Sequence, residues 1–316
     1  MRIRMFWAVG LVAACLLLAA SPLIAADFPE WAYPVNPKAG SLDVAVLKTL
    51  PGSEKQYTQA QVEDDFNPPD WFPGDHPAMP AVVAYGMEPA VKACSKCHLP
   101  NGAGQPESSD LAGLPAAYIQ SQIVDFRDGD RKGARAGSML PIAKAVSEAD
   151  LAAAAQYYAT LKQTDRTKVV ETDTVPLTRL GVGGMRYAID EPGSEPLGDR
   201  IIELPQDAAR AELRDSRIGF IAYAPMGSLA EGEKLVTTGA GGKTMACATC
   251  HADDLKGRED APPLIGRSPI YMFRQLNDIK SGTRAGPKSQ AMLPAVANLS
   301  QHEMLAIAAY LASRKR

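Results

Sequence analysis

Two short runs of identical pattern constrain this chain more than any other feature. They read Cys94-Ser-Lys-Cys97-His98 and Cys247-Ala-Thr-Cys250-His251. Together they use four of the five cysteines and two of the four histidines in 316 residues. Four cysteines in an exported chain can also form disulfides or a zinc site. A histidine directly after the second cysteine, in both runs, favours a different chemistry.

That chemistry is covalent attachment of haem. Two thiols three residues apart on a helical turn can each add to one vinyl group of a single haem, and the adjacent imidazole then faces the iron. We therefore predict two covalently bound haem c groups. The first is held by Cys94 and Cys97, with His98 as an axial ligand of the iron, and the second by Cys247 and Cys250, with His251.

The two runs belong to a longer internal repeat with an offset of 153 residues. The register holds without a gap for about 65 residues and includes glycine, arginine, glutamine and methionine positions. We infer a duplicated domain. Matched pairs include Gly104 and Gly257, Leu111 and Leu264, Tyr118 and Tyr271, Gln122 and Gln275, and Arg131 and Arg284.

A second axial ligand is predicted at matched positions of the two copies. Met139 follows His98 by 41 residues, and Met292 follows His251 by 41. Both methionines stand in a Met-Leu-Pro run, which we expect to form a loop between helices. A lone methionine near a proline is more often a packing residue, but recurrence at the same distance favours iron ligation.

Other side chains compete less well for this role. Met272 and Met304 fall within predicted helices among apolar neighbours and are expected in the core. His76 precedes the first run and is a rival ligand. His302 lies in the first turn of the last helix beside an acidic residue, where we expect it to be solvated.

Histidine and methionine together fill the coordination sphere of haem iron. A filled sphere suits electron transfer and opposes peroxidase or oxygenase chemistry, so we expect an electron-transfer protein with no catalytic residues rather than an enzyme. The soft thioether favours ferrous iron and so raises the potential.

Groups around the two predicted haems can also be named. Each axial imidazole needs an acceptor for its other N–H. We expect backbone carbonyls near Ser109 and in the run starting at Pro262 to serve. Arg131 and Arg284 follow helix-ending glycines and can pair with haem propionates, and a solvated surface position is an equal alternative.

The first 26 residues have the pattern of a secretory signal. Arg2 and Arg4 precede an apolar run, and we expect cleavage after Ala26. The run is shorter than the ~20 residues of a bilayer span, although an uncleaved anchor and lipidation at Cys15 remain alternatives. Cleavage changes the formal charge from −3 to −5. The chain has no strongly basic block, so nucleic acid is not an expected partner.

The remaining chain divides into four parts: an N-terminal extension (27–80), a first domain (81–163), an interdomain segment (164–226) and a second domain (227–316). Helical spacing and capping signals predict helices in both domains, and short β-type runs occur in the interdomain segment. The expected helices are Ala116–Phe126, Glu231–Thr238, Ile270–Ile279 and two that start at Ser147 and Ser300; the β-type runs are Arg200–Leu204 and Ile218–Tyr223. A less clear helical segment lies near Ala81–Ala93, interrupted by Gly86 and Pro89.

On these motifs the chain resembles the class I cytochrome c family, in the tandem two-haem bacterial form typified by cytochrome c-four. The resemblance covers roughly residues 80–165 and 228–316. It implies an all-α fold, with two tandem class I cytochrome c domains, and Met139 and Met292 as distal ligands. An irregular N-terminal extension and a partly β interdomain segment depart from the family pattern. We expect these segments to pack together, cover the interdomain surface or dock a partner.

The resemblance also implies a function. The expected protein is a periplasmic carrier of single electrons between a donor dehydrogenase or quinol-oxidising complex and a terminal oxidase or reductase. One alternative is a cytochrome subunit bound permanently to a periplasmic dehydrogenase. A dihaem peroxidase or a thiosulfate dehydrogenase-type enzyme is a further alternative, which would need an open or labile iron site.

Overall fold

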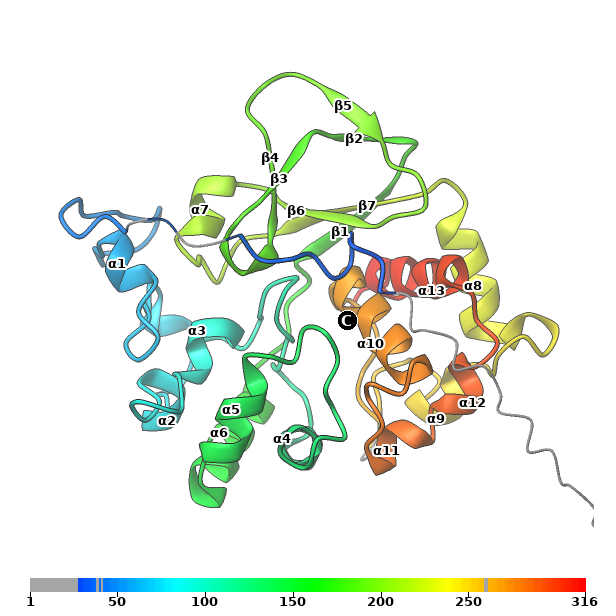
Figure 1. The fold of residues 1–316 in the computed structure, drawn as a ribbon, viewed down its shortest axis with the longest axis horizontal. Helices are drawn as coiled ribbons and strands as arrows, with labels where there is room; N and C mark the ends of the chain where they lie inside the picture. The colour runs from blue at the N-terminus through cyan, green and yellow to red at the C-terminus, as the bar shows by residue number, and fades with distance from the viewer. Residues whose placement is uncertain (1–27, 38–39, 41, 259–260) are drawn as a thin grey trace, which may run out of the picture.

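The computed structural model describes residues 28–37, 40, 42–258 and 261–316. The expected signal peptide and Cys15 lie outside the described residues. Two groups of helices stand side by side, and a layer of strands covers one end of both groups (Figure 1). Within the described residues, no helix is both long enough and apolar enough to cross a membrane.

The first helical group carries the first Cys-x-x-Cys-His run. The Ser147 hydroxyl accepts from the Asp150 N–H and starts the last helix, and left-handed Gly129 ends the helix Ala116–Asp128, as the sequence predicts. Valine, leucine and tyrosine side chains form a separate buried core here. The helices are α2 (Ala81–Ala84), α3 (Cys94–His98), α4 (Ala116–Asp128), α5 (Met139–Ala145) and α6 (Glu148–Thr160).

The second helical group has the larger core. Its first and last helices pack closely because Gly232 has no side chain: a Cβ there would lie 2.7 Å from Tyr310 Cβ. Ser300 and Glu303 form the capping box that opens the last helix. The helices are α8 (Ser228–Thr238), α9 (Ala248–His251), α10 (Pro269–Lys280), α11 (Pro287–Gln290), α12 (Leu293–Val296) and α13 (Gln301–Ser313), with the 3-10 turn η3 (Gly239–Gly241) after α8.

The interdomain segment contains the strands. A three-stranded sheet has the order β1-β7-β6, with β1 parallel and β6 antiparallel to β7. The two β-type runs of the sequence correspond to β6 and β7. The elements are β1 (Thr167–Glu171), β2 (Thr174–Pro176), β3 (Thr178–Leu180), η2 (Val182–Gly184), β4 (Arg186–Ala188), β5 (Ser194–Pro196), β6 (Ile202–Pro205), α7 (Ala208–Glu212) and β7 (Phe220–Ala224).

The N-terminal extension contains only α1 (Gln59–Val62) and the 3-10 turn η1 (Pro73–Asp75) as helical elements among its described residues. It packs against other parts of the chain through aromatic side chains. Trp71 Nε1 donates to the Leu213 carbonyl of the interdomain segment at 2.6 Å. The Trp31 ring packs on Phe273 of α10, with ring centroids 4.5 Å apart. The two extra segments therefore contact each other, and the extension also reaches the second helical group.

The segment near Ala81–Ala93 is helical only to Ala84 and is interrupted at Gly86, as the sequence indicates: Gly86 adopts φ +64° and the chain turns back so that Met87 and Val91 pair. The loop predicted at both methionines was wrong. Met139 begins helix α5 and Met292 caps α12, so neither lies in a plain loop. The prolines that follow them fit a first helical turn, where the missing N–H costs no hydrogen bond.

Candidate haem-binding sites

A cavity of about 450 Å³ lies beside the first Cys-x-x-Cys-His run. Cys94, Cys97 and His98 on α3 line it, and so does Met139 at the start of α5. This volume is within the ~300–1,000 Å³ range of small-molecule and cofactor pockets. Most of its wall is apolar, as a porphyrin requires, with Leu111, Leu114, Ile119, Phe126 and Ile142 among the lining residues.

The two histidines predicted as axial ligands have the same hydrogen-bonding arrangement. His98 Nδ1 lies 2.7 Å from the Ser109 carbonyl, and His251 Nδ1 lies 2.8 Å from the Pro262 carbonyl. A carbonyl oxygen only accepts, so each Nδ1 carries the proton and each Nε2 has a free lone pair. Both acceptors were predicted from the sequence, and the contacts confirm them.

The second histidine provides a test of fit for a metal. His251 is buried, and its Nε2 has no hydrogen-bond partner. An unpaired buried nitrogen costs free energy. An iron atom at this position would use the lone pair, so the donor set fits a haem. Burial also lowers the pKa of both imidazoles, which keeps them neutral and able to bind metal.

Among the described residues, the four cysteines of the two Cys-x-x-Cys-His runs form no disulfide. Burial raises the pKa of Cys94 to about 12 and that of Cys247 to about 11. Cys250 is exposed.

The two predicted distal methionines occupy equivalent backbone positions. The Met139 N–H donates to the Ala136 carbonyl at 2.9 Å, and the Met292 N–H donates to the Ser289 carbonyl at 3.0 Å. Met139 shares the cavity with His98. Met292 is partly buried and packs against the core of the second helical group. The repeat therefore holds in three dimensions at these positions.

The rival ligands lie elsewhere. Both ring nitrogens of His76 are engaged, Nε2 by Asp70 at 3.2 Å and Nδ1 by the Pro77 carbonyl at 2.9 Å. Hydrogen bonding to that aspartate raises the pKa of His76. Met272 and Met304 are buried in the second core, as expected.

His302 is exposed but not simply solvated. Its Nδ1 lies 2.6 Å from Asp199 and its Nε2 lies 2.9 Å from Glu231, so it joins the interdomain segment to α8. Hydrogen bonding to Asp199 raises its pKa.

Arg131 and Arg284 meet where the two helical groups touch. Each donates to the glutamine of its own half and to that of the other half: Arg131 to Gln122 (2.9 Å) and Gln275 (2.8 Å), and Arg284 to Gln275 (3.0 Å) and Gln122 (2.8 Å). Each also reaches the tyrosine of the other half, Tyr271 at 3.3 Å and Tyr118 at 2.8 Å. We call these six residues the arginine junction.

The backbone repeats the symmetry of the arginine junction. Lys132 N donates to Thr283 O at 2.8 Å, and Ala285 N donates to Asp130 O at 2.6 Å. At the offset of 153, Lys132 corresponds to Ala285 and Asp130 corresponds to Thr283, so each contact is the counterpart of the other. The halves are thus related by a local two-fold axis. The sequence predicted polar roles for both arginines but not this cross-pairing.

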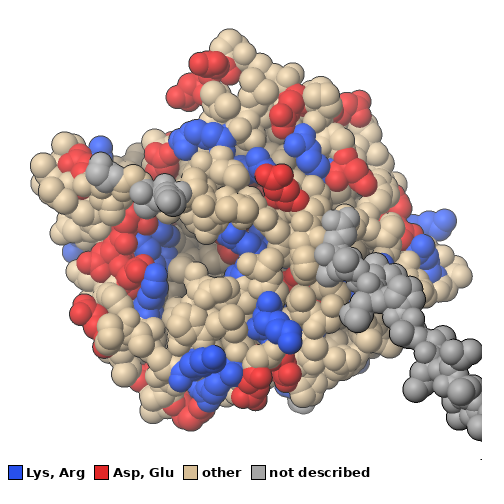
Figure 2. Space-filling model, in the orientation of Figure 1, with Lys and Arg blue, Asp and Glu red and all other residues tan. Residues whose placement is uncertain are grey.

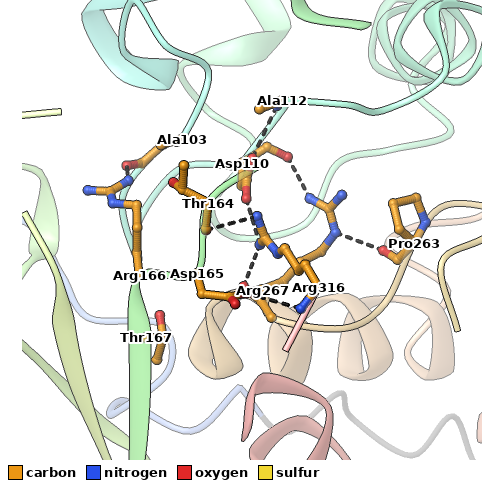
Figure 3. A network of polar contacts seen from close by, with 12 residues as sticks. Ala103, Asp110, Ala112, Thr164, Asp165, Arg166, Thr167, Pro263, Arg267 and Arg316 are labelled. Carbon is orange, nitrogen blue, oxygen red and sulfur yellow. Dashed lines mark hydrogen bonds and ion pairs between the residues drawn. The ribbon is translucent and has the colours of Figure 1, made fainter. Parts of the chain in front are cut away.

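Arg267 was missed by the sequence analysis, and it connects the two histidine loops (Figure 3). Its Nε donates to the Pro263 carbonyl at 2.7 Å and its Nη1 donates to the Asp110 carbonyl at 2.7 Å. These carbonyls directly follow the two that accept from His98 and His251. The counterpart of Arg267 in the first half is Leu114, so the repeat carried no signal for it.

Glu203 on β6 was also missed. It is buried, and its carboxylate accepts from Ser268 Oγ at 2.6 Å and from Thr167 at 3.3 Å. Burial raises the pKa of Glu203 to about 7. Its neighbours Ile202 and Leu204 are buried as well, so both faces of β6 are covered and no alternation along the strand marks the carboxylate.

The face of the molecule in Figure 2 mixes positive and negative side chains over most of its area. On this face, the charges do not form the broad basic stripe that a phosphate backbone requires.

The family described as cytochrome c matches residues 229–315. Cytochrome c-554(548) of Halomonas halodenitrificans is 40% identical over 72 residues, which are 22% of this chain and 87% of that protein. The thiosulfate dehydrogenase electron acceptor of Thiomonas intermedia is 27% identical over 230 residues, covering 72% of this chain and 80% of that protein. Cytochrome c4 of Azotobacter vinelandii is 25% identical over 228 residues, covering 69% of this chain and 82% of that protein.

Among solved structures, thiosulfate dehydrogenase (TsdBA) from Marichromatium purpuratum aligns with a TM-score of 0.49 at 25% identity, over 73% of this chain and 38% of that one. Cytochrome c4 of Acidithiobacillus ferrooxidans aligns with a TM-score of 0.46 at 21% identity, over 70% of this chain and 98% of that one. The short cytochrome from Halomonas is matched over nearly its whole length at high identity. The chain belongs to the cytochrome c family.

Proposed function

We propose that this protein is a dihaem electron carrier. Cys94 and Cys97 would bind one haem c, with His98 and Met139 as axial ligands. The second half would bind the other haem through Cys247 and Cys250, with His251 and Met292 as axial ligands. The supporting observation is that both histidines have Nδ1 occupied by a carbonyl while Nε2 is left for a metal.

A bound haem supplies an iron that changes its charge by one electron. The chain's own residues would hold that iron and limit what reaches it. The carbonyls of Ser109 and Pro262 fix the imidazole rings in one tautomer, which keeps Nε2 available. The apolar wall of the first cavity excludes water and lowers the local dielectric. The two methionines would occupy the remaining axial positions and leave none for a substrate.

The two haem sites would belong to two tandem class I cytochrome c domains, 81–163 and 227–316. The N-terminal extension (27–80) and the interdomain segment (164–226) would join and cover them. Two separate buried cores, one in each helical group, support this division. Arg131 and Arg284 would pair with haem propionates at the arginine junction, where Arg284 Nε is buried and has no protein partner.

The protein would work in the periplasm after removal of the signal peptide. A relative that covers 72% of this chain is named as the electron acceptor of thiosulfate dehydrogenase. This similarity favours a periplasmic dehydrogenase as the electron donor over a quinol-oxidising complex. The electrons would leave to a terminal oxidase or reductase.

The test is a redox and ligation study of the mature holoprotein. Mass spectrometry is expected to show two haem additions, and an optical redox titration is expected to need two one-electron steps. The ferric protein should show the weak long-wavelength band of methionine-ligated haem. Met139→His and Met292→His should each remove about half of that band. A single haem, or uptake of carbon monoxide by both ferrous irons, would refute the proposal.

A further inference from the structure

The wall of the first cavity carries more positive than negative charge. Among the described residues, four arginines and two acids line it, which leaves a formal net charge of +2 because a guanidinium stays charged in proteins. Burial raises the pKa of both carboxyls, and their protonation would add to this excess. The acids are Glu107 and Asp278, and the arginines are Arg131, Arg135, Arg214 and Arg274.

These four arginines come from three parts of the chain. Arg131 and Arg135 belong to the first half, Arg214 to the interdomain segment, and Arg274 to α10 of the second half. Helix α10 lies on the side of the second helical group that faces the first group (Figure 1). Arg274 is only 1% exposed. Residues outside the first half therefore complete the first cavity.

Arg274 faces the first cavity rather than the site of its own half. Its counterpart at the offset of 153 is Ser121 on α4. Helix α4 lines the first cavity with one face, and Ser121 is not on that face. By the symmetry of the repeat, residue 274 on α10 is expected to face away from the second haem site. The α4 residues that line the first cavity are Tyr118, Ile119, Gln122, Ile123 and Phe126.

Hydrogen bonds fix the Arg274 guanidinium at the cavity wall. Its Nη1 donates to the Ala32 carbonyl at 3.1 Å and to Glu107 Oε2 at 3.3 Å, and its Nη2 donates to the Pro106 carbonyl. Arg135 Nη2 lies 3.3 Å from the same oxygen of Glu107. Two guanidinium groups thus share one carboxylate, so the positive charge at this part of the wall is only half balanced.

A further donor in the wall has no partner within the protein. Arg214 Nε is buried and makes no hydrogen bond. The other nitrogens of this side chain are engaged, Nη1 by the Lys96 carbonyl at 2.8 Å and Nη2 by Glu63 at 2.9 Å. Buried donors are almost always paired, so the atom is suited to an acceptor on a bound group. The acceptors that a haem offers at its edge are its two propionates.

We propose that the first haem binds with its propionates toward these arginines, and that Arg274 of the second half is one of the residues that hold them. The inference rests on the proposed function, in which this cavity contains a haem. The net charge of the wall matches the two negative charges of the propionates. Elsewhere the wall is mostly apolar, and a carboxylate buried there would lose its hydration without compensation. The first haem would then depend on the second half for its charge balance.

An optical redox titration of the holoprotein tests this assignment. All variants are compared in the Met292→His background, where loss of the thioether lowers the potential of the second haem and leaves the first as the upper step. Arg274→Gln removes a positive charge and should disfavour the reduced haem. We expect the ratio of reduced to oxidised first haem at a fixed applied potential to fall about tenfold, which is about 59 mV for a one-electron couple. Arg274→Lys keeps the charge and should retain most of the original potential.

Glu107→Gln separates an effect of charge from structural damage. It removes a negative charge from the same cluster, so the potential of the first haem should rise by a similar factor. Loss of packing would instead move Arg274→Gln and Glu107→Gln in the same direction. Arg217→Gln is the control for net charge: this exposed arginine pairs with Asp75 outside the cavity, and its replacement should leave the potential of the first haem unchanged.

Mass spectrometry checks that each variant retains both haems. If Arg274→Gln loses the first haem, the rise expected for Glu107→Gln still decides the question. The inference is overturned if the first haem keeps its potential in Glu107→Gln, if both variants shift it in the same direction, or if Arg274→Gln shifts the second haem more than the first. A wild-type protein with a single haem, or without the methionine–iron band, would instead refute the proposed function.

Discussion

Gly232→Ala should destabilise the second helical group, although alanine is the better helix former. A Cβ at residue 232 would lie 2.7 Å from both Ala306 C and Tyr310 Cβ, whereas carbon atoms normally approach to ~3.5–4.0 Å. Helices α8 and α13 would have to separate by about 1 Å. Overpacking of this kind costs ~1–3 kcal/mol, while the helix propensity of alanine returns up to about 1 kcal/mol.

The expected result is a net loss of about 1–2 kcal/mol in the free energy of unfolding, equal to a few degrees in Tm at about 2–4 °C per kcal/mol. Urea and thermal unfolding of the holoprotein, followed by circular dichroism, measure it. Glu233→Ala, at an exposed neighbouring position on α8, controls for helix propensity. A Gly232→Ala protein more stable than the wild type would refute the close packing, because propensity alone predicts stabilisation.

Three further predictions follow from buried or paired charges. Burial raises the pKa of Glu203 to about 7, so the folded state binds a proton that the unfolded state has lost, and stability should fall as pH rises from about 4.5 to about 7. Glu203→Gln should reduce the dependence of the urea unfolding midpoint on pH over that range. An unchanged dependence would contradict this assignment. Hydrogen bonding to Asp199 raises the pKa of His302, so its stabilisation should be complete below pH 6.5 and disappear as pH rises through the folded-state pKa; His302→Gln should remove this dependence from thermal unfolding curves, and its persistence would contradict the assignment. Arg267→Met removes hydrogen bonds to both histidine loops and should cost ~2–4 kcal/mol in unfolding by urea; it should shift both haem potentials in an optical titration, and a shift in only one would show that the loops are independent.

The sequence predicts the proximal side of the candidate site well because that side is local. Cys97 and His98 are adjacent, and the carbonyl of Ser109 is only 11 residues away. The long helices were also predictable, since their caps and apolar faces lie within the helices themselves. α4 starts and ends close to the expected residues, and α13 starts directly after Ser300 as expected.

Contacts between distant segments could not be predicted. The repeat shows that Arg131 corresponds to Arg284, but it does not show how the two halves face each other. The burial of Glu203 could not be predicted, because its partners Thr167 and Ser268 belong to segments that fold onto it from elsewhere in the chain. Met139 was placed correctly in the repeat, but its helix was missed because proline usually indicates a helix boundary.

The arginine junction limits how the two halves can diverge. Gln122 and Gln275 each accept from both arginines, so replacing one glutamine removes a contact to each half at once. Interfaces with this reciprocity are typical of two-fold symmetric dimers. We therefore expect a substitution at either glutamine to weaken the contacts of both halves, so that the surface of one half cannot change here without a matching change in the other.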